Sequence, residues 1–205
     1  LCGRHHRIYQ DKHGGGLVMS ISIAMEGLLL RLRKDLVGLH GPEHIGICSP
    51  ADVPDQIHLG LHLYQVRYDG MAQVGSFMKD ERLLASAPLP LALDVLITAY
   101  TGRRSGLLED YRLLDLVLAS LHDGARIDYQ SELQPSLQPL PHIHLLDVDP
   151  DQMSKLWQFP NVPYRLSLCY EMRPVYVPSN IAVVVARVKD TELRASDLDS
   201  EGGRP

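Results

Sequence analysis

Apolar residues recur at helical spacing near the start of the chain. In "SISIAMEGLLLRLRKDLVGL" (residues 20–39) the apolar positions follow a period of about 3.6 residues, and most charged residues fall between them. The repeating positions are Ile21, Met25, Leu28, Leu29, Leu32 and Leu36. This pattern predicts an amphipathic helix that starts near Met19 and is ended by Gly38, Gly41 and Pro42.

A second long helix is predicted in "LLEDYRLLDLVLASLHDG" (residues 107–124). Gly124 can adopt the left-handed conformation that often follows a last helical turn. The expected apolar face consists of Leu107, Leu108, Tyr111, Leu114, Val117, Leu118 and Leu121. A short helix is predicted in "DPDQMSKLWQ", where Asp149 can cap, Pro150 suits the first helical position and Gln152 can complete a capping box.

Strand patterns fill most of the remaining chain. "QIHLGLHLYQVRYD" (residues 56–69) alternates apolar and polar residues, as a half-buried strand does. "LPLALDVLITAY" (89–100) is mostly apolar, which indicates a central strand covered on both faces. Residues 70–88 between them have no firm period and are expected to form a hairpin arm or a long loop. Further strands are predicted at 125–130, 140–148, 164–177 and 181–188.

These elements predict the fold class. Two long helices, one short helix and about five or six strands do not alternate strictly, so we expect an α+β fold with a mixed or antiparallel sheet. No linker divides the chain. We expect a single domain over residues 19–188, preceded by a flexible extension (1–18) and followed by a flexible acidic tail (189–205).

Composition narrows the partners and the compartment. A chain of 205 residues with 45% hydrophobic content can build one full core. The net charge of -5 gives no basic face for nucleic acid or an anionic membrane, and no apolar run is long enough to span a bilayer. Cys2, Cys48 and Cys169 have no repeated spacing and are expected to be reduced thiols. We therefore expect synthesis in the cytoplasm, without nucleic-acid or membrane partners.

Histidines and carboxylates are the residues that could supply a catalytic or metal-binding site. On a strand, His58 and His62 would lie about 13 Å apart, too far to share one ion. His142 and His144 share a strand face, but no further ligand lies at a matching short spacing. The chain has no G-x-S-x-G nucleophile motif, and Glu109 and Asp110 suit the start of a helix electrostatically. No catalytic residue, metal or cofactor is expected.

Five residues are candidates for contacts with other proteins. Arg103 and Arg104, in the turn "TGRRSG", could form a solvated turn, hold an anion or meet an acidic partner. Trp157 and Phe159 end the short helix and are followed by Pro160 and Pro163. Their rings could complete the core, or one of them could anchor an interface. Arg165 on the next strand could pair or stack with Trp157.

Three blocks of sequence carry a family resemblance. They are "PLPLALDVLITAY", "EDYRLLDLVLASLHD" and "SKLWQFPNVPYRLSLCYEMRPVYVPS", and their order and spacing match those of a known family. Together with the first helix and the "HLGLHLYQVRYD" strand, they make residues 20–188 resemble the cap, or tail-terminator, family of extracellular contractile injection systems. The loop "GRRSG" departs from the family pattern, and so does the amino-terminal extension.

The resemblance implies a structural protein and not an enzyme. It implies a ring of identical chains, expected to be a hexamer, on the distal end of the inner tube and outer sheath. Such a ring would end tube growth and hold the last sheath layer in a particle that can be released from the cell. A head-to-tail ring needs two different complementary patches on each subunit.

Two alternatives remain open from the residues themselves. One is a small hydrolase-like, ligand-binding or metal-binding α+β enzyme that uses the histidine-rich strands. Bound zinc in the purified protein would favour it. The other is a tube-end adaptor of a different contractile machine, such as a phage tail.

Overall fold

The structure is a computed structural model that describes residues 20–36, 41–72, 77–80, 83–101, 106–127, 140–177, 179 and 182–184. The expected terminal extensions (1–18 and 189–205) lie outside the described residues. So do Arg103 and Arg104 and most of the strand expected at 125–130.

All three predicted helices are present. They are α1 (Ile21–Asp35), α2 (Leu107–Asp123) and α3 (Pro150–Leu156), and a short 3-10 turn, η1 (Pro42–His44), follows α1. The capping prediction for α3 is confirmed, because the Asp149 side chain accepts a hydrogen bond from the Gln152 N–H at 2.8 Å and Pro150 occupies the first turn. Ser20 caps α1 in the same way through the Ile23 N–H.

The main sheet has five strands. They are β1 (Ile45–Ile47), β2 (Leu59–Tyr68), β5 (Leu89–Ala99), β6 (His142–Leu145) and β7 (Ser167–Val177). Their spatial order is β1-β2-β5-β7-β6. β1 runs parallel to β2 and the other pairs are antiparallel, so the sheet is mixed and the α+β prediction is confirmed.

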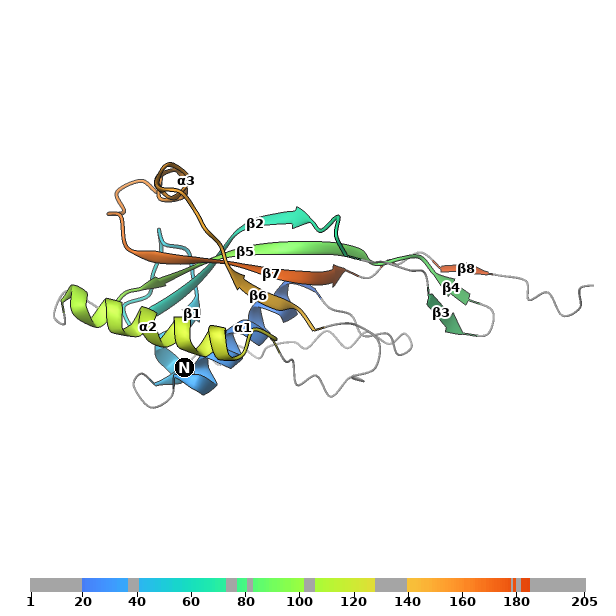
Figure 1. Cartoon of the computed structure of the whole chain (residues 1–205), viewed down its shortest axis with the longest axis horizontal. Helices are drawn as coiled ribbons and strands as arrows, with labels where there is room; N and C mark the ends of the chain where they lie inside the picture. Colours follow the sequence, from blue (N-terminus) through green and yellow to red (C-terminus); the bar gives the residue numbers. More distant parts are fainter. Residues whose placement is uncertain are drawn as a thin grey trace, which may run out of the picture.

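A smaller sheet stands apart from the main one. It consists of β3 (Phe77–Asp80), β4 (Leu83–Ala85) and β8 (Ala182–Val184), all antiparallel. Of the two options for residues 70–88, the structure has the hairpin. Of the strand expected at 181–188, the described part, β8, pairs with this hairpin. In Figure 1 the small sheet lies at the end of the long axis away from α2 and α3.

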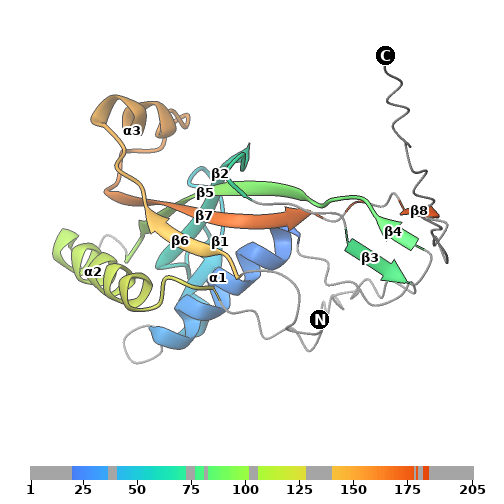
Figure 2. The same ribbon diagram turned by 45° about the vertical axis from the view of Figure 1, so that its right-hand side comes forward.

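Helices cover both faces of the main sheet, but unequally. Figure 2 shows α1 and α2 on one side of the sheet and α3 on the other. The larger core cluster lies between the sheet and α1 and α2, and includes Leu28, Leu93 and Val117. The smaller cluster holds Leu96, Trp157 and Cys169 beneath α3. Every residue from Pro90 to Ala99 is buried, which confirms β5 as the covered central strand.

Two predictions about α2 are wrong. At its first turns Leu107, Leu108 and Tyr111 are exposed by 68%, 61% and 43%, because this end of α2 extends past the ends of the strands (Figure 1). Gly124 has a φ of -134° and is not left-handed. A Cβ at this position would displace the guanidinium of Arg31, which lies directly against Gly124.

Candidate interaction surfaces

A chain of ion pairs crosses the sheet on the α3 side. Arg67 on β2 donates two hydrogen bonds to Asp94 on β5, each 2.8 Å long, and one of 2.6 Å to Glu171 on β7. Arg173 continues the chain, with its Nε 3.2 Å from Glu171 and its Nη1 3.6 Å from Asp69. These hydrogen bonds raise the pKa of Arg67. These ion pairs tie three strands together and place each of the charges beside an opposite one.

Strand register brings these charges together. Gln65 and Glu171 both pair with Asp94, on opposite sides of β5, so side chains at and near these positions share one sheet face. The sequence prediction missed this cluster. Its one signal was Asp94, a lone carboxylate in an apolar run that is 3% exposed in the fold. A buried carboxylate in a central strand requires a cationic partner.

Trp157 belongs to the smaller core cluster. Its side chain is 6% exposed and lies in a cluster with Leu96 and Cys169. Phe159 and Tyr164 meet its ring edge-on, with centroids 6.2 and 5.8 Å away. The indole Nε1 is buried, and it alone among the buried side-chain nitrogens and oxygens of the described chain has no hydrogen-bond partner. In this fold the tryptophan holds α3 on the sheet.

Arg165 has different contacts from those expected. Its guanidinium lies over the ring of Tyr100, 5.2 Å from the centroid, and its Nη1 is 3.6 Å from Asp110. Asp110 also accepts hydrogen bonds from the N–H and the hydroxyl of Thr101, at 2.9 and 2.6 Å. Asp110 thus joins the start of α2 to the end of β5, in addition to opposing the positive end of the helix dipole.

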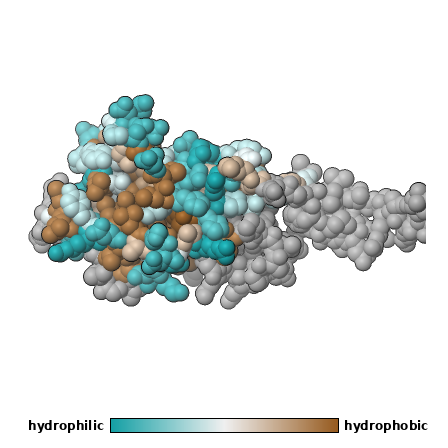
Figure 3. Space-filling model, in the orientation of Figure 1, coloured by the Kyte–Doolittle hydropathy of each residue, from teal (hydrophilic) through white to brown (hydrophobic). Residues whose placement is uncertain are grey.

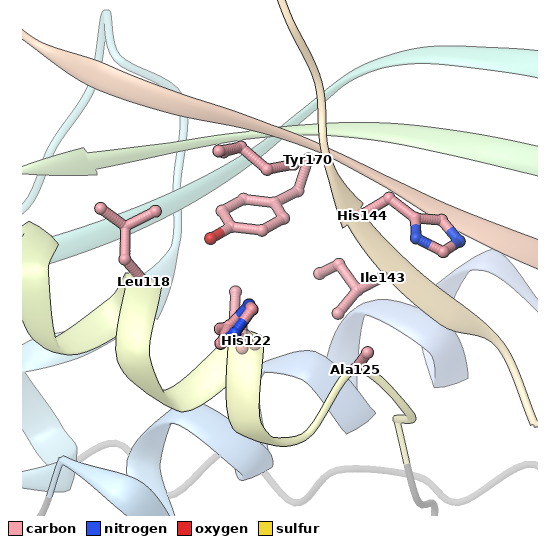
Figure 4. Close-up of a pocket in the computed structure, with 8 residues that line it drawn as sticks. Leu118, His122, Ala125, Ile143, His144 and Tyr170 are labelled. Carbon is pink, nitrogen blue, oxygen red and sulfur yellow. The ribbon is translucent and has the colours of Figure 1, made fainter.

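A shallow apolar pocket of about 330 Å³ lies between α2 and the edge strand β6 (Figure 4). Leu118 and Ile143 line it from its two sides, and Tyr170 forms part of its wall. His122 on α2 and His144 on β6 also line it, and burial raises the pKa of Tyr170. In Figure 3 hydrophobic residues gather on the face that carries α2 and β6. Leu145 on β6 is 55% exposed there.

Five of the described histidines contact other rings, three of them on strands β2 and β6. His44 and His58 stack with centroids 4.3 Å apart, His142 and His144 stack at 6.1 Å, and His62 meets the edge of Phe159 at 5.9 Å. Within the described residues, no three or more metal-ligating side chains are grouped in a way that could hold an ion.

The thiols offer little nucleophilic chemistry. Cys48 and Cys169 are both unpaired, and Cys169 is buried. Burial raises the pKa of each thiol, with Asp52 adding to the effect at Cys48. A raised pKa reduces the thiolate fraction that a nucleophile needs.

None of the described helices is both long and apolar enough to span a bilayer.

Comparison with known proteins gives a family and two related structures. The family model described as the Pvc16 N-terminal domain matches residues 31–189, and a search of curated proteins finds no match. The fold is similar to the sheath/tube terminator of PVC, an extracellular contractile injection system, in the extended state. That match has a TM-score of 0.56 and 18% identity, and covers 88% of this chain and 66% of the other.

A second similar structure is the tube-terminating cap of the anti-feeding prophage AFP. It matches with a TM-score of 0.53 and 16% identity, over 85% of this chain and 60% of the other. This chain therefore spans less than two thirds of the length of either structure. The family resemblance found in the sequence is confirmed.

Proposed function

Because the chain belongs to the Pvc16 N-terminal domain family, we propose that it is the cap of a contractile injection particle. It would assemble with identical copies into a ring, expected to be a hexamer, on the distal end of the inner tube and sheath. There it would end tube growth and anchor the last sheath layer, acting by binding alone. The particle would be made in the cytoplasm and could be released from the cell.

One observation carries this proposal. Most of this chain superimposes on two proteins that are terminators or caps of such particles. The sequence blocks that first indicated the family form helices and strands of this shared fold. The described site chemistry is consistent with a binding role. Charged side chains of the central strands pair with one another, and the strand histidines contact other rings.

Interface roles for the five candidate residues belong to the same proposal. Arg165 precedes β7 and lies beside Asp110 at the start of α2. Its side chain is 32% exposed there and can still meet a partner. Phe159 lies at the margin of the Trp157 cluster. Trp157 would act indirectly, by fixing the position of α3. For Arg103 and Arg104 we propose contact with an acidic surface of a neighbouring chain.

Electron microscopy of particles from cells that lack the gene, beside the parent strain, tests the proposal. We expect tubes of uncontrolled length or tubes that have lost their sheath. Reintroducing the gene should restore uniform, capped particles, which controls for effects on neighbouring genes. Capped particles of normal length in the deletion strain would contradict the cap function.

A further inference from the structure

The main sheet ends in a different surface at each of its two edges. Its strand order places β1 at one edge and β6 at the other. The outer side of β6 is already paired with this chain's own segment after α2. The Ile143 N–H donates to the Ala125 carbonyl at 2.7 Å, and the Ile127 N–H donates to the Pro141 carbonyl at 3.0 Å. A neighbouring chain can therefore meet this edge through side chains, and not by adding a strand.

The β6 edge carries the apolar pocket between α2 and β6 (Figure 4). Its volume is about 330 Å³, and Leu145 in its lining is 55% exposed. Hydrogen-bond donors surround this apolar space. His122 and His144 line it and are exposed, and Arg126 is exposed on the segment that pairs with β6. Asp123, next to His122, is an exposed carboxylate on the same turn. A group that fits this site is apolar and has acceptors beside it.

The β1 edge has the complementary character. Ile47 is 48% exposed at the end of β1. Three exposed carboxylates flank β1 in the sequence, namely Glu43, Asp52 and Asp55. Arg33 contacts β1, but its guanidinium donates to the Ile45 carbonyl at 2.7 and 3.1 Å. This edge thus presents an apolar side chain together with hydrogen-bond acceptors.

Both surfaces lie on the sheet face that carries α1 and α2. Ile47 is two residues from Ile45, which belongs to the core cluster beneath α1, and alternate residues of a strand share a face. Leu145 pairs with Tyr170, which belongs to the same cluster. Rotation about a ring axis keeps each sheet face on one side of the ring, so surfaces that meet should lie on the same face.

The two surfaces also lie at similar heights along the strands. Ile47 is aligned with Ile97 on β5 through the pairing of β1 with β2. Leu145 is aligned with Val95 on β5 through β7. Ile97 and Val95 are two residues apart, which is about 7 Å along a strand. Copies in a closed ring are related by rotation alone. If the strands cross the ring plane, surfaces that meet must therefore lie at similar heights.

We propose that the cap ring closes through side chains, with Ile47 of one copy seated in the pocket between α2 and β6 of the next. This inference rests on the proposed ring. The carboxylates beside β1 accept hydrogen bonds from His122, His144 and Arg126 of the neighbouring copy. An apolar anchor within a polar rim is the common anatomy of a protein interface. Each copy uses its two edges differently, as a head-to-tail ring requires.

Cross-linking in purified particles tests this contact. The full chain carries Ile47→Cys and Leu145→Cys, with Cys2 and Cys48 changed to Ser and the buried Cys169 retained. A short bis-maleimide is the reagent, because it joins thiols across a side-chain contact without the strict geometry of a disulfide. We expect most of the monomer band to be converted into a ladder of multiples that ends at the closed ring.

The two single-cysteine chains are the matched controls. In a head-to-tail contact neither cysteine meets its own counterpart, so each single variant should stay monomeric. Dimers from both single variants would indicate a twofold contact. A double variant that cross-links no more than the single ones would show that the two edges do not meet. Either result overturns this contact and leaves the cap function standing. If the chain is absent from particles of the parent strain, the cap function fails and the ring fails with it.

Charge at the anchor gives an independent measurement. Ile47→Lys should leave the chain folded, because the side chain is exposed at a sheet edge. Its incorporation into particles should fall about tenfold or more, because an ammonium group would enter an apolar pocket. Ile47→Leu keeps an apolar anchor and should be incorporated normally. Leu30→Lys, at a position 63% exposed on α1, controls for the added charge and should also be incorporated normally. Incorporation of Ile47→Lys at the parent level would overturn the contact.

Discussion

Asp94 carries a charge within a strand that is otherwise apolar and buried. Its carboxylate is held by Arg67, so removing the arginine would leave an uncompensated charge in the sheet. We expect Arg67→Ala to lower the free energy of unfolding by about 2–3 kcal/mol, less than for a fully buried pair because the Arg67 side chain is 42% exposed.

The Arg67 prediction has a matched control. The Arg112 side chain is 64% exposed and pairs with Glu109 on the surface of α2, so Arg112→Ala should cost less than about 0.5 kcal/mol. Urea unfolding followed by circular dichroism measures both variants. Equal losses for the two arginines would show that Asp94 does not depend on its partner.

His62 should make stability depend on pH. Burial lowers the pKa of its imidazole below the ordinary value of 6.5, so the unfolded chain binds a proton more readily than the folded one. The stability due to neutral His62 is fully present above pH 6.5 and is lost as the pH falls from that value through the lower pKa of the folded state. His62→Gln should therefore lose less stability than the parent between pH 7.5 and 5.5 in urea unfolding.

Urea unfolding of the parent chain at the same pH values is the control. A parent-like pH dependence in His62→Gln would contradict the assigned role of His62 burial.

At the scale of elements, α3 depends on one side chain. Trp157 fills the space between α3 and the sheet, so Trp157→Ala should create a cavity and cost about 3 kcal/mol or more. Trp157→Phe should cost clearly less, because it keeps an aromatic ring and removes an N–H that has no partner. Urea unfolding of the two variants measures the difference, and a phenylalanine variant as unstable as the alanine variant would contradict this account.

Helices and strands could be predicted where a local pattern decides them. The Asp149 cap of α3 and the mostly apolar run of β5 each identify their element, since the controlling contacts lie within a few residues. Contacts between distant segments could not be read in this way. Arg165 faces Tyr100 and Asp110 instead of Trp157 because strand and helix ends meet there in space.

The same limit explains what the sequence missed at the candidate surfaces. The partners of Asp94 follow from the register of β2, β5 and β7, which no single strand encodes. The exposure of Leu107 and Leu108 follows from where the sheet ends beneath α2, although their helical spacing resembles that of core residues.

At the scale of the whole molecule, the five-stranded sheet and the small sheet are separate hydrogen-bonded units. The small sheet is connected along the chain to β2, β5 and β7 of the main sheet. These three strands are held together because β5 pairs with both β2 and β7. The backbone hydrogen bonds of the main sheet thus do not require the small one. A protein that must contact other chains can place such an arm outside its core without losing its fold.

A shortened chain tests this independence. Replacing residues 73–87 with a short Gly-Ser linker and ending the chain after residue 179 removes β3, β4 and β8 but keeps the pairing of β2 with β5. We expect the variant to unfold in one cooperative transition with its helix signal intact, because the described core clusters pack α1, α2 and α3 on the main sheet. If the variant instead loses its cooperative transition, the arm is part of the folding unit. If it folds but is not incorporated into particles, the arm carries a contact that assembly needs.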